Sequence, residues 1–198
     1  ILVGDFVTAV ARHNKKHANA RVEEAYNNGK RLDGAPVSRR TKIKAIAVAI
    51  IPKAIANSQW CRASLPNMNK LRTVLLRSAH GKARLSRCLE ILLACFYYPT
   101  RMDPLFAALF RTFTHARRLL SKSADRKDRF IADFLNPNRK SVTAIGPVSE
   151  ILDAAQLLGI KLAMQQGNLM LTTANGISIA IDEKSKGYFI FVLREAIK

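Results

Sequence analysis

The chain has 198 residues, of which 48% are apolar, and this is enough for a packed core in one substantial domain or two small ones. Its 33 Lys and Arg residues outnumber the 14 Asp and Glu residues, so the net charge is +19 and an anionic partner is expected. The apolar content also argues against a disordered chain. Arg and Lys interrupt every apolar run before it reaches the length of a membrane span, so no membrane-spanning protein is predicted.

The N-terminal part of the chain is predicted to form a strand and then helices. β-Branched residues partly alternate over residues 1–10, which is typical of a strand, and residues 12–31 are polar and helix-prone. Ser38 is a good N-cap for the next helix, in which apolar residues recur every three or four positions. Pro52 is expected to kink this helix or to end it early because it lacks an amide hydrogen. The residues expected to mark the end of the first helix are Gly29, Asp33, Gly34 and Pro36.

The middle of the chain is predicted to be helical. Residues 66–80 form a helix that Gly81 ends in a left-handed conformation, and residues 86–98 form a strongly apolar helix. Asp103 and Pro104 are a paired N-cap and first-turn signal for another helix. That helix carries two apolar stripes, which we interpret as core and not as base-stacking platforms. The stripe residues are Leu105, Phe106, Leu109, Phe110, Phe113, Ala116 and Leu120.

A domain boundary is predicted near residue 140. Residues 121–140 mix charges of both signs and are interpreted as a short helix around Phe130 followed by the linker Asn136–Asn138. Pro147 then begins a helix that Gly159 closes. Three short strands follow at residues 160–164, 169–172 and 177–181, and residues 188–197 close the domain as a helix or a strand.

The charge changes at the same place. Residues 1–140 carry 28 basic and 9 acidic side chains, whereas residues 141–198 carry 5 of each, and no acidic residue lies between Asp33 and Glu90. This one-signed stretch is typical of a polyanion-binding surface. The predicted fold class is mainly α, with a basic helical domain over residues 1–140 and a small neutral α+β domain over residues 141–198. The candidate nucleic-acid-binding residues are Arg39, Arg40, Lys42, Lys44, Lys53, Arg62, Lys70, Arg72, Arg77, Lys82, Arg84, Arg87, Arg117 and Arg118.

The sequence contains no familiar catalytic motif. A catalytic triad, a phosphate-binding loop, a dinucleotide fingerprint and a zinc-protease motif are all missing, so no catalytic residue, cofactor or small-molecule substrate is predicted. Asp125, Asp128 and Asp133 alternate with basic residues and are interpreted as local ion pairs, not as metal ligands.

The cysteines indicate a reducing compartment. Cys61, Cys88 and Cys95 are an odd number and lack the spacing of paired metal ligands, so we predict buried thiols instead of a disulfide framework or a zinc site with His80. The chain begins without Met inside an apolar run, which we interpret as a piece of a longer or processed product.

Four stretches, taken in order, carry a family resemblance. They are LVGDFVT (residues 2–8), PVSRRTKIKAIAVAIIPKAIANSQW (36–60), LRTVLLRSAHGKARLSRCLEILLACFYYPTRMDPLFAALFRTFTHARRLL (71–120) and GPVSEILDAAQLLGIKL (146–162). Together they resemble the region after the catalytic palm in reverse transcriptases of non-LTR retrotransposons, especially those of dinoflagellates and related protists. The resemblance implies a last palm strand, a thumb-like unit of basic helices that grips a duplex backbone, and a C-terminal module. The family's catalytic aspartates would precede Ile1, and His80 stands where relatives have Trp.

These observations predict a non-catalytic structural RNA-binding protein of a large ribonucleoprotein, with structured RNA, above all rRNA, and neighbouring proteins as partners. Its most concrete form is a mitochondrial ribosome component derived from a reverse-transcriptase fragment, in the mitochondrial matrix or another reducing compartment. The alternative is the thumb and connection region of an active reverse transcriptase, an RNA-directed DNA polymerase. A scaffold that binds a protein or an anionic membrane is a third class, and it would expose apolar residues along a basic helix.

Overall fold

The structure is a computed structural model, and it describes residues 11–81, 102–122, 124–135, 146–183 and 185–197. The strand predicted at residues 1–10, the helix predicted at 86–98 and the linker predicted at 136–138 lie outside the described residues. The fold is mainly helical with a small antiparallel sheet towards the C-terminus, which confirms the predicted fold class. By its internal contacts the chain divides into two compact units, Ile1–Ala108 and Leu109–Lys198.

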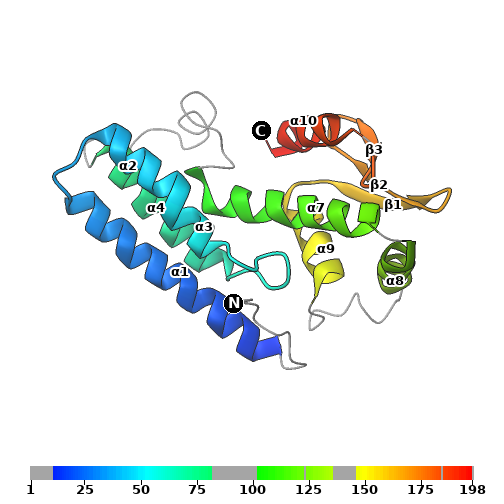
Figure 1. The fold of residues 1–198 in the computed structure, drawn as a ribbon, viewed down its shortest axis with the longest axis horizontal. Coiled ribbons are helices and arrows are strands. Elements are labelled where there is room, and N and C mark those ends of the chain that lie inside the picture. The colour runs from blue at the N-terminus through cyan, green and yellow to red at the C-terminus, as the bar shows by residue number, and fades with distance from the viewer. Residues whose placement is uncertain (1–10, 82–101, 123, 136–145, 184, 198) are drawn as a thin grey trace. The chain divides into compact units, whose positions relative to one another are not determined.

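Among its described residues, the first unit contains a bundle of three helical arms that pack side by side (Figure 1). Asn19 Oδ1 accepts a hydrogen bond from Ser64 N at 2.9 Å, and farther along both helices Asp33 pairs with Arg77, so the first and third arms run parallel. The middle arm runs in the opposite direction and packs against both of them, while α1 and α4 also contact each other directly. The first arm is α1 (Ala11–Gly34), the middle arm is α2 (Arg39–Ala45), η1 (Ile46–Ile50) and α3 (Ile51–Ala54), and the third is α4 (Leu65–His80).

Gly29 lets α1 and α4 approach closely. A Cβ atom at this position would lie 2.9 Å from Val74 Cγ1 and 3.2 Å from Leu75 Cδ2, and both of these side chains are buried in the core of the bundle. Valine is stiff at χ1 in a helix, so Val74 cannot easily move aside. The expectation that Gly29 marks the end of the first helix is therefore wrong, because α1 continues to Gly34 and Gly29 serves helix packing.

The middle arm passes Pro52 by widening one turn. Pro52 has no amide hydrogen, so the α-helical hydrogen bond to Val48 O cannot form. The π-helical turn η1 directly precedes this position, and Ile51 N donates to Ile46 O, five residues back. α3 then ends at Ala54, two residues after Pro52, as the sequence predicted.

Two predicted N-caps are confirmed. Ser38 Oγ accepts a hydrogen bond from Thr41 N at 3.2 Å, and Asp103 Oδ1 accepts one from Leu105 N at 2.8 Å. Gly81 follows α4 with φ +80° and ψ 162°. Its φ is positive as predicted, but its ψ lies outside the left-handed helical region, so α4 leads into extended backbone.

The second unit combines helices with a three-stranded antiparallel sheet of order β1-β2-β3. Gln166 and Gly167 both have positive φ, which suits the two-residue turn that joins the first two strands. Leu171 is fully buried at the centre of the sheet and pairs with Leu162 and Ile179. The elements are α7 (Pro104–Lys122), which begins in the first unit, α8 (Ala124–Leu135), α9 (Pro147–Leu157), β1 (Lys161–Gln165), β2 (Asn168–Thr172), β3 (Ser178–Ala180) and α10 (Lys186–Ile197).

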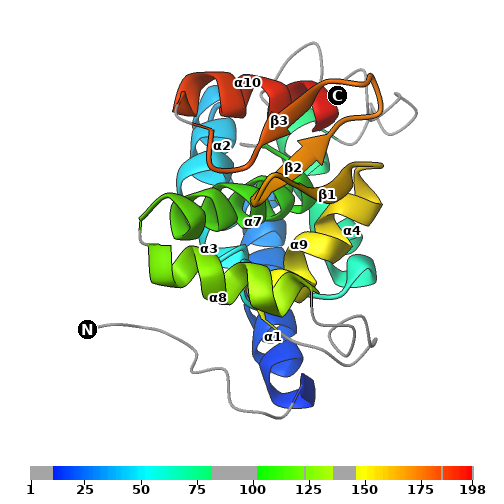
Figure 2. The same ribbon diagram turned by 90° about the vertical axis from the view of Figure 1, so that its right-hand side faces the viewer.

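Most of α7 and all of α8 belong to the second unit, whereas the sequence placed them in a domain ending at residue 140. Lys127 Nζ on α8 donates to Asn168 Oδ1 and Asp182 Oδ2, both at 2.7 Å, and Arg117 Nη2 on α7 donates to Glu183 O at 2.6 Å. Figure 2 shows α7, α8 and α9 grouped with the sheet. The division near residue 108 gives the second unit 14 basic and 8 acidic residues, so this unit is not neutral.

Candidate nucleic-acid interface

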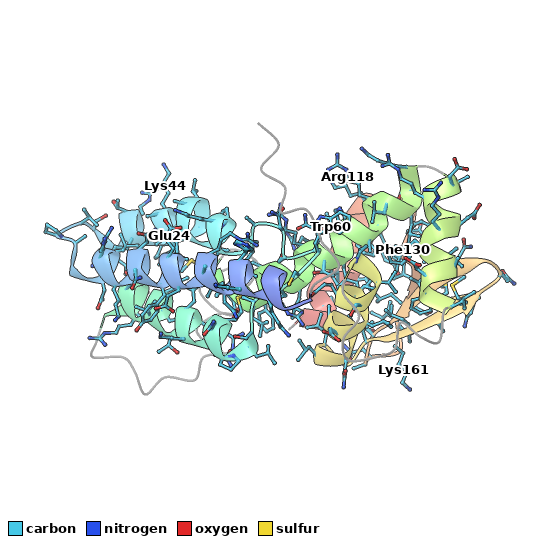
Figure 3. The ribbon with its side chains drawn as sticks, turned by 90° about the horizontal axis from the view of Figure 1, so that it is seen from below. Glu24, Lys44, Trp60, Arg118, Phe130 and Lys161 are labelled. Atoms are coloured by element: carbon cyan, nitrogen blue, oxygen red, sulfur yellow. The ribbon has the colours of Figure 1, made fainter. Side chains whose placement is uncertain are left out.

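The start of the middle arm places four predicted cations at one end of the bundle. Ser38 caps α2, and Ile46, one turn beyond the cations, is fully buried, so the polar residues before it face outwards. Figure 3 shows Lys44 pointing away from the bundle. The exposed cations are Arg39, Arg40 and Lys44, and Lys42 is half-buried.

The last turns of α1 and α4 meet this start. Lys42 Nζ donates to Asp33 O at 2.8 Å, and Arg77 Nε lies 3.3 Å from Asp33 Oδ2. Arg39 Nη2 lies 3.0 Å from His80 Nδ1, and because a guanidinium can only donate, the imidazole nitrogen accepts. We name this surface the bundle end. It comprises Lys30, Arg31, Arg39, Arg40, Lys42, Lys44, Arg77 and His80, with Asp33 as the acidic residue among them.

A groove of about 490 Å³ runs between α1 and α4 beside the bundle end. Lys30 Nζ and Lys70 Nζ lie 4.6 and 4.5 Å from the centroid of the Tyr26 ring, so two ammonium groups share one aromatic side chain. Neither Lys30 nor Tyr26 was among the residues predicted from the sequence. The groove is lined by Tyr26, Lys30, Asp33, Lys70, Thr73, Val74 and Arg77.

Acidic residues of α1 neutralise some of the cations between Asp33 and Glu90, a stretch that contains no acidic residue. Lys53 Nζ lies 2.6 Å from Glu24 Oε1, and Lys70 Nζ lies 3.3 Å from Glu23 Oε2. Both pairs are about half exposed and contribute at most about 1 kcal/mol to stability. Their effect on the surface charge is larger, because they lower the positive potential along α3 and α4 while the bundle end keeps its excess.

Three of the candidate arginines point into the fold. Arg62 is only 8% exposed. Arg72 Nε lies 2.5 Å from Asp103 Oδ2, and burial raises the pKa of this carboxyl although Arg72 and two amide hydrogen bonds oppose the change. Arg117 donates to Glu183 O and lies 5.8 Å from the centroid of the Phe189 ring. These three side chains are placed to hold the fold together. The candidates Lys82, Arg84 and Arg87 lie outside the described residues.

Arg118 is exposed on α7, and it is accompanied by cations that were not predicted from the sequence. Arg111 and Lys122 are exposed on the same helix, and His115 is half-buried between them. Burial, followed by the charges of Arg118 and Arg111, lowers the pKa of His115. The signal that would have found these residues is their spacing of four, three and four, which places them on one helical face.

Within the part of the chain that the structure describes, no group of three or more His, Cys, Asp and Glu side chains is placed to hold a metal ion. No described helix is long and apolar enough to cross a membrane. Cys61 is half-buried, less than the sequence predicted, and its thiol donates to Arg62 O at 4.0 Å, whereas Cys88 and Cys95 lie outside the described residues. Comparisons with protein-family models, with curated proteins and with solved structures found no match.

Proposed function

We propose that this protein is a non-catalytic structural RNA-binding protein of a large ribonucleoprotein, and that the bundle end is its main contact with RNA. The observation that supports this most is the concentration of Arg and Lys around a single acidic residue, Asp33, where the ends of three packed arms meet. Cations fixed on a folded surface bind phosphates and release their counterions, which favours association with any dense polyanion.

The arrangement favours recognition of the RNA backbone. Arg39 and Arg40 can each donate two parallel hydrogen bonds to a phosphate, whereas Lys42 and Lys44 act as point charges. The ammonium groups of Lys30 and Lys70 lie over the Tyr26 ring, and Phe113 on α7 is fully buried. Neither ring is therefore presented as a platform for base stacking. Binding by charge and shape suits structured RNA such as rRNA.

The specific form of the proposal is a component of a mitochondrial ribosome, derived from a reverse-transcriptase fragment and surrounded by rRNA and neighbouring proteins. The alternative is the thumb and connection region of an active reverse transcriptase, as the family resemblance of the sequence implies. A palm with paired catalytic aspartates in the same polypeptide would favour this alternative. Co-purification of the native protein with rRNA and ribosomal proteins would favour the ribosomal form.

The test of the interface is a salt titration of RNA binding by the full chain. The variant replaces Arg39, Arg40, Lys42 and Lys44 with Gln, and the probe is a labelled RNA hairpin. Because the buried face of the middle arm is unchanged, the fold should be retained. The slope of log affinity against log salt should fall by about one unit for each phosphate that the variant no longer binds.

The matched control removes four cations of the first unit that lie outside the bundle end. They are Lys15, Lys16, Lys53 and Lys70, all of them exposed. Both variants lose the same charge, so a general effect of net charge would lower their slopes equally. The proposal predicts that the bundle-end variant loses clearly more of the slope than the control does. Equal slopes in the two variants, or a wild-type affinity that does not depend on salt, would contradict it.

A further inference from the structure

A second basic surface lies on the outer face of α7. Arg111, His115, Arg118 and Lys122 follow one another at spacings of four, three and four residues, so they line one face of the helix. The opposite face is buried in the core of the second unit, where Phe113 is fully enclosed. At 1.5 Å per residue this row of side chains extends over about 16 Å. We name these four residues the α7 strip.

The charge of the α7 strip has one sign. The helix Pro104–Lys122 contains no Asp or Glu. Burial lowers the pKa of His115 most, and the charges of Arg118 and Arg111 lower it further because they disfavour another proton beside them. An anion bound along the strip would therefore relieve the repulsion between neighbouring cations. The opposite arrangement is found on α8, where exposed Arg126 and Arg129 are interspersed with Asp125 and Asp128.

The strip suits a nucleic-acid strand better than an acidic protein. Specific protein interfaces have an apolar centre, but the large apolar residues exposed in the described part of the second unit all lie on helices other than α7. They are Leu135, Leu157, Tyr188 and Phe191. Thr114, on the same side of α7, directs its hydroxyl to Phe110 O at 3.0 Å. The strip thus offers a line of cations without an anchoring pocket. Such a line matches a row of phosphates, since each strand of a nucleic-acid duplex presents closely spaced charges of one sign along its axis.

We propose that the α7 strip is a second RNA-backbone contact, which holds successive phosphates of one strand, so that both units of the chain bind RNA. The inference rests on the proposed function and extends it from the first unit to the second. It predicts that the removal of charge from the strip weakens RNA binding by the full chain even when the bundle end is intact.

The experiment compares two triple variants of the full chain in salt titrations with the labelled RNA hairpin. The strip variant carries Arg111→Gln, Arg118→Gln and Lys122→Gln. The control carries Arg126→Gln, Arg129→Gln and Lys161→Gln, which are also exposed residues of the second unit. Figure 3 shows Lys161 and Arg118 on opposite sides of this unit. The strip variant should lose about two to three units of the salt slope, and the control should lose less than one.

A charge-conserving variant, Arg111→Lys with Arg118→Lys, keeps the test valid if the Gln variant is poorly folded, because it should retain the wild-type slope. Equal slopes for the strip variant and its control would overturn the inference. If the bundle-end variant had lost its slope in the same assay, the proposed function would still stand. Loss of polyglutamate binding in the strip variant with unchanged RNA binding would assign the strip to an acidic protein and would also overturn the inference.

Discussion

The buried pair of Arg72 and Asp103 gives a sharp test of how the first unit is held together. Asp103 is completely buried, its side chain caps α7, and Arg72 is only 16% exposed. Replacing Arg72 with Met keeps an unbranched chain against Phe106 but leaves a buried carboxylate without its counter-ion. Loss of one partner of a buried pair costs about 3–5 kcal/mol. Because the two amide hydrogen bonds to Asp103 remain, we expect about 3 kcal/mol at pH 7.

The cost of Arg72→Met should depend on pH. Burial raises the pKa of Asp103 even beside Arg72, and removal of the guanidinium raises it further. A carboxyl whose pKa is higher in the folded chain contributes stability below its unfolded pKa and loses it as pH rises through its folded pKa. The difference from wild type should therefore be largest at neutral pH and should shrink towards about pH 4.

Urea unfolding followed by the fluorescence of Trp60, the single tryptophan, measures this cost in the first unit. Arg40→Met removes the same group from an exposed position and should change the free energy of unfolding by less than about 0.5 kcal/mol. A cost below about 1 kcal/mol for Arg72→Met at pH 7, or a cost that grows on acidification, would refute the reasoning.

Three further changes test the packing and the charges. Gly29→Ala should destabilise the bundle by about 1 kcal/mol, because the clash with Val74 exceeds the gain in helix propensity, whereas Gly34→Ala, which meets nothing within 4 Å, should be neutral or stabilising in the same urea assay. Because the pKa of His115 is lowered in the folded chain, its protonation opposes folding, and the wild type should lose thermal stability as pH falls below about 6.5. His115→Gln should not show this loss. Lys53→Gln should cost less than about 1 kcal/mol in urea unfolding, because its pair with Glu24 is half exposed.

The elements with strong local signals could be predicted from the sequence. Ser38 and Asp103 act as N-caps because each offers a side-chain oxygen to amides that the helix leaves unpaired, and this depends on neighbouring residues alone. The apolar periodicity of residues 66–80 likewise determines which face of α4 is buried. The hairpin turn at Gln166 and Gly167 was predictable for the same reason, since glycine readily adopts positive φ.

Features that depend on contacts between distant residues could not be predicted. Arg117 and Lys127 connect α7 and α8 to Glu183 and Asp182, more than 50 positions along the chain, within the second unit. The boundary near residue 140 was predicted from the change in charge and from the Asn-Pro-Asn segment, and neither of these signals depends on such contacts. The role of Gly29 is another such feature, because the need for a small residue comes from Val74 on a different helix.

The same limit applies to the candidate interface, because charge along a sequence is not charge on a surface. The stretch between Asp33 and Glu90 has no acids, yet the fold sets Glu23, Glu24 and Asp103 against three of its cations. Cations that α1 neutralises contribute less to a phosphate site than those of the bundle end, although a simple count treats them alike. Conversely, the cations of α7 are separated by apolar residues in the sequence, and the helix brings them onto one face. The RNA contacts that we propose should therefore follow the positions of the unneutralised cations on the folded surface and not the number of cations in the sequence. Variants of equal net charge that differ in the position of the lost cations distinguish these two possibilities.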